Sequence, residues 1–193
     1  MNEVKAMDTL NAEIVRGRGT SEEVGIVGVY DIEVVRDGEI IHRSTHKNTV
    51  TTEGKRYLLD AALANSAAGF AEQTAWYVAL VSTNTAAAAT YVYDTFFDST
   101  TGPAAEFTSY YGGVRKDWTG VLDGSAASIT NSASRASFAI TGGGTLYGAC
   151  LVSNSLLSDH TAGDYVFSYA LFASPIAVVN TDTVNVTITI TLN

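Results

Sequence analysis

The chain has 193 residues, enough for one domain that buries a core without a disulfide or a metal to hold it. It is 46% hydrophobic and only 16% charged, which excludes an intrinsically disordered polymer. Residues 57–193 hold three of the eleven basic residues but ten of the twenty acidic ones, so this part repels nucleic-acid phosphates, and a nucleic-acid-binding protein is excluded.

The first 24 residues predict an extended N-terminal arm, followed by a single β-rich domain over residues 25–193. The arm is polar, carries the sequence RGRGTSEE at residues 16–23, and lacks a sustained strand or helix period. Its candidate partner-contact residues are Arg16 and Arg18. Fully extended, such an arm reaches on the order of 80 Å, enough to cross a neighbouring subunit. A frayed tail without function is the alternative.

A β-hairpin is predicted at the start of the domain. Tyr30, Ile32 and Val34 recur at every second position, the period of a strand with one buried face. Asp37–Gly38 supplies a tight turn, because glycine tolerates the positive φ that such a turn demands. The return strand is expected to begin at Ile40.

One short α-helix is predicted next. Thr51 or Thr52 can cap its N-terminus, and Glu53 lies where the helix dipole favours an acid. Further residues follow at helical spacing: Tyr57, Leu58, Ala61, Ala62 and Asn65. We expect about three turns, packed across the end or a face of a sheet.

Short strands separated by Gly, Ser and Asn turns are predicted for the rest of the chain. Residues 136–140 and 146–152 flank three consecutive glycines and suggest a second hairpin. In residues 164–172, four side chains are expected on one face: Tyr165, Phe167, Tyr169 and Leu171. Residues 184–192 alternate strictly between apolar and Thr or Asn side chains. The fold class predicted is mainly β, a β-sandwich or a Greek-key or jelly-roll-like barrel.

An aromatic-rich segment extends from residue 91 to residue 118. Long loops without their own structure are usually functional or disordered, and this one is too aromatic to be disordered. Its rings either belong to the core or form a contact patch, since Tyr and Trp suit interfaces. For the second alternative, the candidate partner contacts are Tyr110, Tyr111 and Trp118.

No catalytic, cofactor-binding or metal-ligating residue is predicted. His42 and His46 are four residues apart, but their surroundings read as strand, so a solvated sheet edge explains them better than a metal site. Cys150 is interpreted as a small buried core thiol. The acidic residues do not match the spacing of an EF-hand loop, which leaves open only a Ca²⁺ site built from loop oxygens. We therefore expect that the protein is not an enzyme.

Three stretches resemble a group of small structural proteins from the virions of tailed bacteriophages. The first comprises NTVTTEG at 48–54, YLLD at 57–60 and WYVAL at 76–80. The second comprises RKDWT at 115–119, SITNSA at 128–133, Phe138 and GTLYGA at 144–149, and the third is DTVNVT at 182–187. The resemblance covers the chain in order from residue 48 to its end and implies a virion structural component, with no catalytic residue to carry over.

From the resemblance, the acidic body and the arm, we expect a capsid decoration or cement protein that bridges capsid subunits on the outer shell. Its expected partners are the major capsid protein and copies of itself, in a trimer, with no nucleic acid and no membrane. No secretory leader and no apolar run of about 20 residues is present, so synthesis in the host cytoplasm is expected. The alternative is a tail, fibre or collar component that contacts a host glycan.

Overall fold

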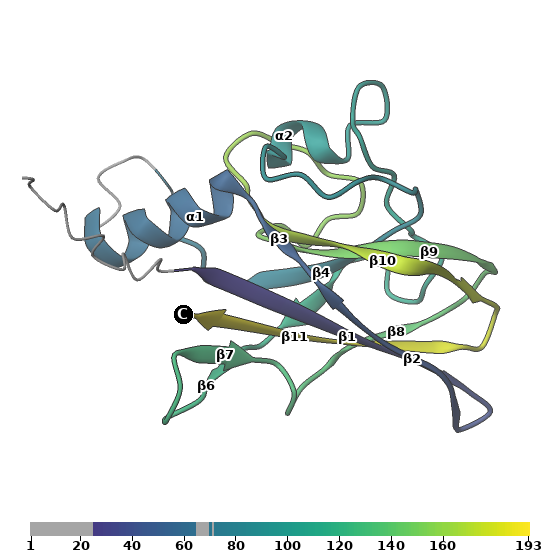
Figure 1. The fold of residues 1–193 in the computed structure, drawn as a ribbon. Helices are drawn as coiled ribbons and strands as arrows, with labels where there is room; N and C mark the ends of the chain where they lie inside the picture. Colours follow the sequence, from purple (N-terminus) through teal and green to yellow (C-terminus); the bar gives the residue numbers. More distant parts are fainter. Residues whose placement is uncertain (1–24, 65–69, 71) are drawn as a thin grey trace, which may run out of the picture.

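The computed structural model describes residues 25–64, 70 and 72–193. The fold is mainly β, as predicted, and two antiparallel sheets lie face to face as a β-sandwich with a short helix at one end (Figure 1). The predicted arm, with Arg16 and Arg18, lies outside the described residues.

The six-stranded sheet is built around the predicted hairpin and the C-terminal strand. Its strand order is β2-β1-β11-β7-β6, with β8 also paired to β11. Asp37 and Gly38 have φ values of 52° and 83°, so the hairpin turn forms where the sequence predicts it. The strands are β1 (Ile26–Arg36), β2 (Glu39–Lys47), β6 (Val121–Leu122), β7 (Ser128–Thr130), β8 (Ala136–Ala139) and β11 (Thr183–Leu192).

The five-stranded sheet has the order β3-β10-β9-β4-β5. Its strands are β3 (Thr49–Val50), β4 (Trp76–Val81), β5 (Lys116–Trp118), β9 (Gly144–Val152) and β10 (Val166–Val178). The main core lies between the two sheets and takes Tyr30, Ile32 and Val186 from one sheet and Leu80 and Leu146 from the other. These side chains alternate along their strands, because successive residues of a strand point to opposite faces.

The predicted second hairpin is wrong. β8 pairs with β11 in the six-stranded sheet, whereas β9 pairs with β4 and β10 in the five-stranded sheet. The glycines at 142–144 therefore lead the chain from one sheet to the other. Phe138 and Leu146, which flank them, face the same core from opposite sides.

The expectation of one aromatic face in residues 164–172 is also wrong. The pairing of β10 with β9 shifts register between Val166 and Ser168, a bulge that resets the alternation. Phe167 packs in the core between the sheets, while Val166 and Tyr169 belong to a second apolar cluster on the outer face of the five-stranded sheet.

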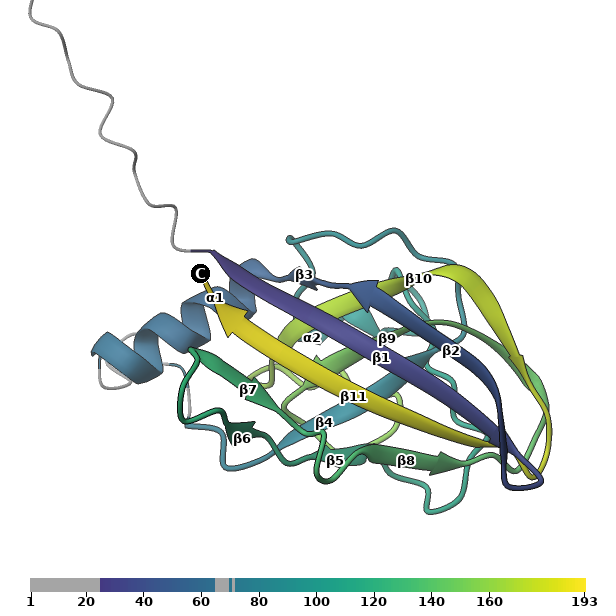
Figure 2. The same cartoon turned by 60° about the horizontal axis from the view of Figure 1, so that its bottom comes forward.

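The predicted helix is confirmed as α1 (Thr52–Leu59), and a π-helical turn, η1 (Asp60–Ala64), continues it. Thr51 is the N-cap, and its side-chain oxygen accepts a hydrogen bond of 2.8 Å from the Gly54 amide. A Cβ atom at position 54 would collide with the Phe167 backbone, so glycine allows the helix to lie against β10. The helix closes one end of the sandwich (Figures 1 and 2).

The segment from residue 82 to residue 115, called here the cover, lies over the outer face of the five-stranded sheet and contains the short helix α2 (Tyr93–Phe96) (Figure 1). Tyr93, Phe96 and Phe97 pack on that face and form the second apolar cluster with residues of β9 and β10. Phe107 and Tyr110, later in the cover, belong instead to the main core between the sheets. Most of the predicted aromatic segment is therefore core. The buried aromatic residues are Tyr93, Phe96, Phe97, Phe107 and Tyr110.

Candidate docking site

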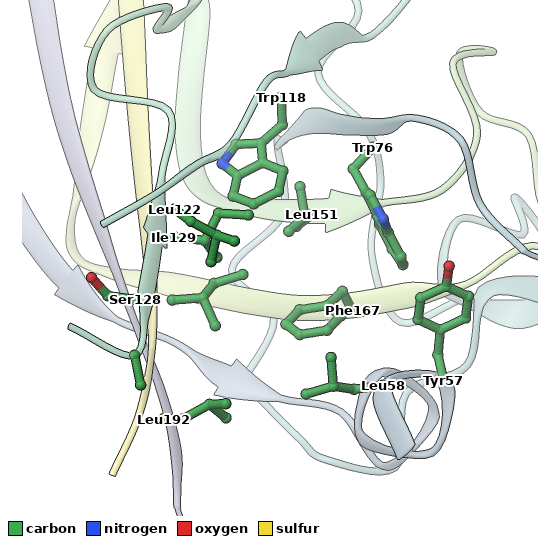
Figure 3. Close-up of a pocket in the computed structure, with 12 residues that line it drawn as sticks. Tyr57, Leu58, Trp76, Trp118, Leu122, Ser128, Ile129, Leu151, Phe167 and Leu192 are labelled. Carbon is green, nitrogen blue, oxygen red and sulfur yellow. The ribbon is translucent and has the colours of Figure 1, made fainter. Parts of the chain in front are cut away.

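An apolar pocket opens at the end of the sandwich where α1 lies, between the two sheets (Figure 3). Its volume is about 320 Å³. We call this pocket the apolar mouth. It is lined by Tyr57, Leu58, Trp76, Trp118, Leu122, Ala127, Ser128, Ile129, Leu151, Phe167, Ile190 and Leu192.

Both sheets and the helix contribute to the apolar mouth. Strands β6, β7 and β11 supply one wall, strands β4, β5, β9 and β10 supply the other, and α1 closes the side with Tyr57 and Leu58. Between β5 and β6 the chain passes from one sheet to the other around the Trp118 ring. A Cβ atom on Gly120 would meet that ring, so glycine permits the close turn.

The two indole rings of the apolar mouth are held in place. The Trp118 Nε1–H donates to the Ile188 carbonyl oxygen at 3.3 Å. The Trp76 ring meets Tyr57 and Phe167 edge to face, with centroid distances of 5.1 and 5.6 Å. These contacts fix the walls of the pocket, which gives it a defined shape before any partner binds.

Large apolar side chains are exposed around the apolar mouth. Leu122 is 72% exposed, and its neighbour Val121 and the pocket-lining Leu192 are exposed as well. Leu59 and Leu63, on the helix and the π-helical turn, are exposed too but line a separate hollow, and Leu63 is 81% exposed. A group of exposed aliphatic side chains next to an apolar pocket is typical of an interaction surface.

The predicted partner-contact residues Tyr110, Tyr111 and Trp118 lie in three different environments in the structure. Trp118 lines the apolar mouth. Tyr111 is 75% exposed but lies outside this pocket, and Tyr110 is only 4% exposed because its ring packs edge to face on Phe138 at a centroid distance of 4.8 Å. Tyr110 therefore has no ring surface to offer a partner in this conformation. The contacts of Trp118 and Tyr111 with a partner stay a prediction.

Sequence reasoning missed most of the apolar mouth, including Leu58, Leu122 and Leu192. One signal was present, since Val121–Leu122 is an apolar pair between Gly120 and the turn residues Asp123 and Gly124. The residues around this pair do not alternate between apolar and polar side chains as in a half-buried strand, so the sequence gives no reason to expect the pair to be buried.

A buried polar cluster holds the cover in place. The Arg115 side chain is fully buried and forms a paired contact with the Glu106 carboxylate, at 2.9 and 3.0 Å. It also donates to the Tyr93 hydroxyl oxygen at 2.7 Å and, outside the cover, to the Asn154 carbonyl oxygen at 2.9 Å. Burial alone would lower the pKa of Arg115, but the hydrogen bonds and charge of Glu106 outweigh it and raise that pKa. These groups satisfy one another, which is the arrangement of a structural anchor.

The histidine and cysteine residues show no catalytic arrangement among the described residues. His46 is buried, which corrects the expectation of a solvated edge, because its ring stacks on Phe172 at 4.6 Å and accepts a hydrogen bond from the Ala173 amide. Burial lowers the pKa of His46. Cys150 is a buried core thiol, as expected, and burial raises its pKa.

Two further findings concern the described part of the chain. It contains no group of three or more His, Cys, Asp or Glu side chains placed to hold a metal ion. None of its helices combines the length and the apolar character needed to cross a membrane.

The lining of the apolar mouth determines what it can bind. Among its lining residues none carries a carboxylate, an imidazole or an ammonium group, and the polar groups are two hydroxyls and two indole N–H groups. A pocket of this size and lining suits one or two apolar side chains of a protein segment. In comparisons with known proteins, no family model, no curated protein and no solved structure matches this chain.

Proposed function

We propose that this protein is a non-enzymatic structural component of a bacteriophage particle, a capsid decoration protein that binds the outer shell and bridges capsid subunits. The observation that carries the proposal is the apolar mouth with its exposed aliphatic rim. The sequence resemblance to small tailed-phage virion proteins is the reason for proposing that the assembly is a bacteriophage particle.

In this proposal the apolar mouth is the anchor of the interface. An apolar side chain of the major capsid protein enters the pocket between Trp76 and Trp118, and Leu122 and Leu192 pack around it. Interfaces draw most of their affinity from a few such buried contacts near their centre. Modest affinity at each copy suffices, because a trimer that binds several capsid subunits gains from effective concentration.

The charge distribution supports a position on the outside of the shell. The chain has a formal net charge of −9, and most of the excess lies in residues 57–193. Such a body is repelled by packaged nucleic acid and stays soluble away from its partner.

The test is co-sedimentation of the purified protein with capsids that lack it. The variant Leu122→Asp places a carboxylate on the rim of the apolar mouth, and we expect it to abolish binding. The matched control is Ile41→Asp, the same kind of change at an exposed apolar residue of β2, outside the pocket lining. Equal binding by both variants and the unaltered protein would refute the role of the apolar mouth.

A second candidate is a tail, fibre or collar component that contacts a host glycan, and the exposed ring of Tyr111 favours it because aromatic faces suit stacking on sugars. Gold labelling of virions with an antibody against the protein separates the two. Label over the head supports the decoration role. Label restricted to the tail, together with glycan-array binding lost in Tyr111→Ala, supports the second candidate instead.

A further inference from the structure

β2 and β10 lie next to each other at one side of the sandwich but are not paired as strands (Figure 2). Strand pairing joins β1 to β11 along their length, and beyond it Gly25 and Asn193 exchange two backbone hydrogen bonds, of 3.1 and 2.9 Å. β2, in contrast, is an edge strand that pairs with β1 alone. The contact between β2 and β10 therefore depends on side chains.

His46 of β2 makes this contact. The residue is only 7% exposed, and its ring stacks on Phe172 of β10 with the ring centroids 4.6 Å apart. The Nδ1 atom accepts a hydrogen bond of 3.2 Å from the Ala173 amide, also in β10. The Nε2 atom lies 2.8 Å from Ser44 Oγ, which in turn lies 3.0 Å from His42 Nε2. One imidazole thus connects the two sheets at this side of the sandwich.

These contacts assign the proton of the His46 ring. The Ala173 amide can only donate, so Nδ1 carries no hydrogen. A neutral imidazole then has its hydrogen on Nε2 and donates it to Ser44 Oγ, and the Ser44 hydroxyl donates in turn to His42 Nε2. The hydrogen bond from β10 therefore exists only in the neutral form of His46.

We propose that His46 is a pH-sensitive latch, which holds β2 against β10 while its ring is neutral and releases this side of the sandwich in mild acid. A hydrogen on Nδ1 would face the Ala173 N–H at 3.2 Å, so that two donors meet where an acceptor is needed. The ring would also carry a positive charge at a buried position. Release returns the charged ring to water and uncovers Phe172, which is 5% exposed in the latched fold.

The groups around His46 favour the neutral ring. Burial is the largest cause that lowers its pKa below the ordinary value of 6.5, and His42 lowers this pKa further, whereas Asp31 of β1 raises it. Tyr30, the residue opposite His46 on β1, stays neutral because burial raises its pKa. Lys47 lies on the other, outer face of β2. The part of β10 that contacts the ring carries no ionisable side chain.

The direction of the pH dependence follows from the lowered pKa. In the released state His46 is in water and titrates near its ordinary value of 6.5. The released state therefore binds the proton more readily than the latched state. The stabilisation from the latch is complete above that ordinary value and is lost as pH falls from it through the pKa of the latched ring. This inference concerns the free protein and does not depend on the proposed docking function.

Hydrogen exchange at the Ala173 amide in the full chain tests the latch. After correction for the intrinsic exchange rate at each pH, we expect the protection of this amide to fall about tenfold between about pH 7.5 and about pH 5. The Ile188 amide, which donates to Asn131 Oδ1 in the six-stranded sheet, is the internal reference and should keep its protection. Unchanged protection of Ala173 over this range would overturn the proposal.

His46→Phe is the direct variant. Its phenyl ring keeps the stacking on Phe172 but cannot take up a proton, so the protection that remains at Ala173 should not change with pH. The matched control is His160→Gln, at an exposed histidine outside the latch, which should lose protection in acid as the unaltered protein does. An equal loss in His46→Phe would assign the effect to another group and overturn the latch.

His42→Gln provides a second measurement that leaves the His46 ring in place. The amide oxygen of the glutamine can still accept from the Ser44 hydroxyl, but the neighbouring ionisable group is gone, so the pKa of His46 should rise toward 6.5. The loss of protection in acid should then be smaller. NMR titration of the His46 ring protons measures this pKa in both proteins. A value at or above 6.5 in the unaltered protein would overturn the proposal, because the fold would not then favour the neutral ring.

Discussion

The cover and the apolar mouth are two apolar regions of the same sandwich, and they differ in how far their apolar side chains are buried. The outer face of the five-stranded sheet is buried under the cover, from which Tyr93, Phe96 and Phe97 complete the second apolar cluster. At the apolar mouth, Trp76 and Trp118 are only partly buried, and Leu122 is exposed. The chain covers one apolar face with its own loops and leaves aliphatic side chains exposed at the other, and this contrast is the basis of the proposed docking role.

The two regions also differ in what holds them. The cover is fastened by polar contacts. Arg115, held by Glu106, donates to the Asn154 carbonyl oxygen, and the Glu53 carboxylate accepts hydrogen bonds from the Tyr93 and Val166 amides at 3.1 and 2.7 Å. The apolar mouth is held by ring contacts and one indole hydrogen bond. Polar anchors specify one geometry for a loop, whereas an apolar pocket accepts any well-fitting apolar side chain.

The largest effect on the cover is expected from Arg115→Ala. The substitution leaves the fully buried Glu106 carboxylate without its partner, which typically costs about 3–5 kcal/mol of unfolding free energy. Urea unfolding followed by circular dichroism measures it. The control is Arg135→Ala, which breaks a partly exposed pair with Glu33 and is expected to cost at most about 1 kcal/mol. Similar losses in both variants would contradict the anchoring role.

A smaller loss is expected from Thr51→Ala, at the helix between the two regions. Thr51 caps α1, and its hydroxyl donates to the Val166 carbonyl oxygen of β10. Removing a Thr cap costs about 0.5–2 kcal/mol. The neighbouring Thr52→Ala, an exposed position inside the helix, is the control, and thermal unfolding compares them. If Thr52→Ala lowers the stability as much as Thr51→Ala does, loss of the helix cap does not explain the effect of Thr51→Ala.

A pH-dependent contribution is expected from Asp159, which joins the cover through the Tyr93 hydroxyl. Burial alone would raise the pKa of Asp159, but hydrogen bonds from Thr161 and Tyr93 outweigh it and lower that pKa. A depressed carboxyl pKa stabilises the fold above the unfolded value of about 3.9, and this contribution is lost as pH falls through the folded pKa. Asp159→Asn should therefore be less stable than the unaltered protein near neutral pH, with a gap that narrows in acid. A gap independent of pH would rule out this linkage.

The smallest effect on stability is expected from Leu122→Ser. Because Leu122 is exposed, its loss should change the unfolding free energy by no more than about 0.5 kcal/mol. Leu151→Ala, a buried residue of the same lining, should cost about 2–5 kcal/mol. Chemical denaturation of both variants measures their unfolding free energies and so compares Leu122 at the rim of the pocket with Leu151 in its wall. A large loss at Leu122 would mean that the rim serves folding rather than contact.

The elements that sequence reasoning predicted are those whose signals are local. The turn at Asp37–Gly38, the Thr51 cap and the alternation in β11 each depend on a few consecutive residues. The separation of β8 and β9 into different sheets depends on pairing with strands distant in the sequence. No local signal distinguishes that crossover from a hairpin, because both need glycines between two strands.

The candidate site was less predictable than the fold. The apolar mouth is assembled from residues between Tyr57 and Leu192, so only Trp118 among the predicted contacts belongs to it. Tyr110 and Tyr111 are adjacent in the sequence, yet one is buried and the other exposed. Composition identifies a residue type that suits an interface, but the face on which it lies is decided by tertiary packing.

The hydrogen bonds between Gly25 and Asn193 have a practical consequence for engineering the chain. A reporter or purification tag fused after Asn193 lies next to the pocket and obstructs whatever enters it. The hairpin tip at Asp37–Gly38 lies at the far end of the sandwich (Figure 2) and is the better insertion point. The same proximity of Gly25 and Asn193 makes the domain suited to circular permutation, with new ends opened at that tip.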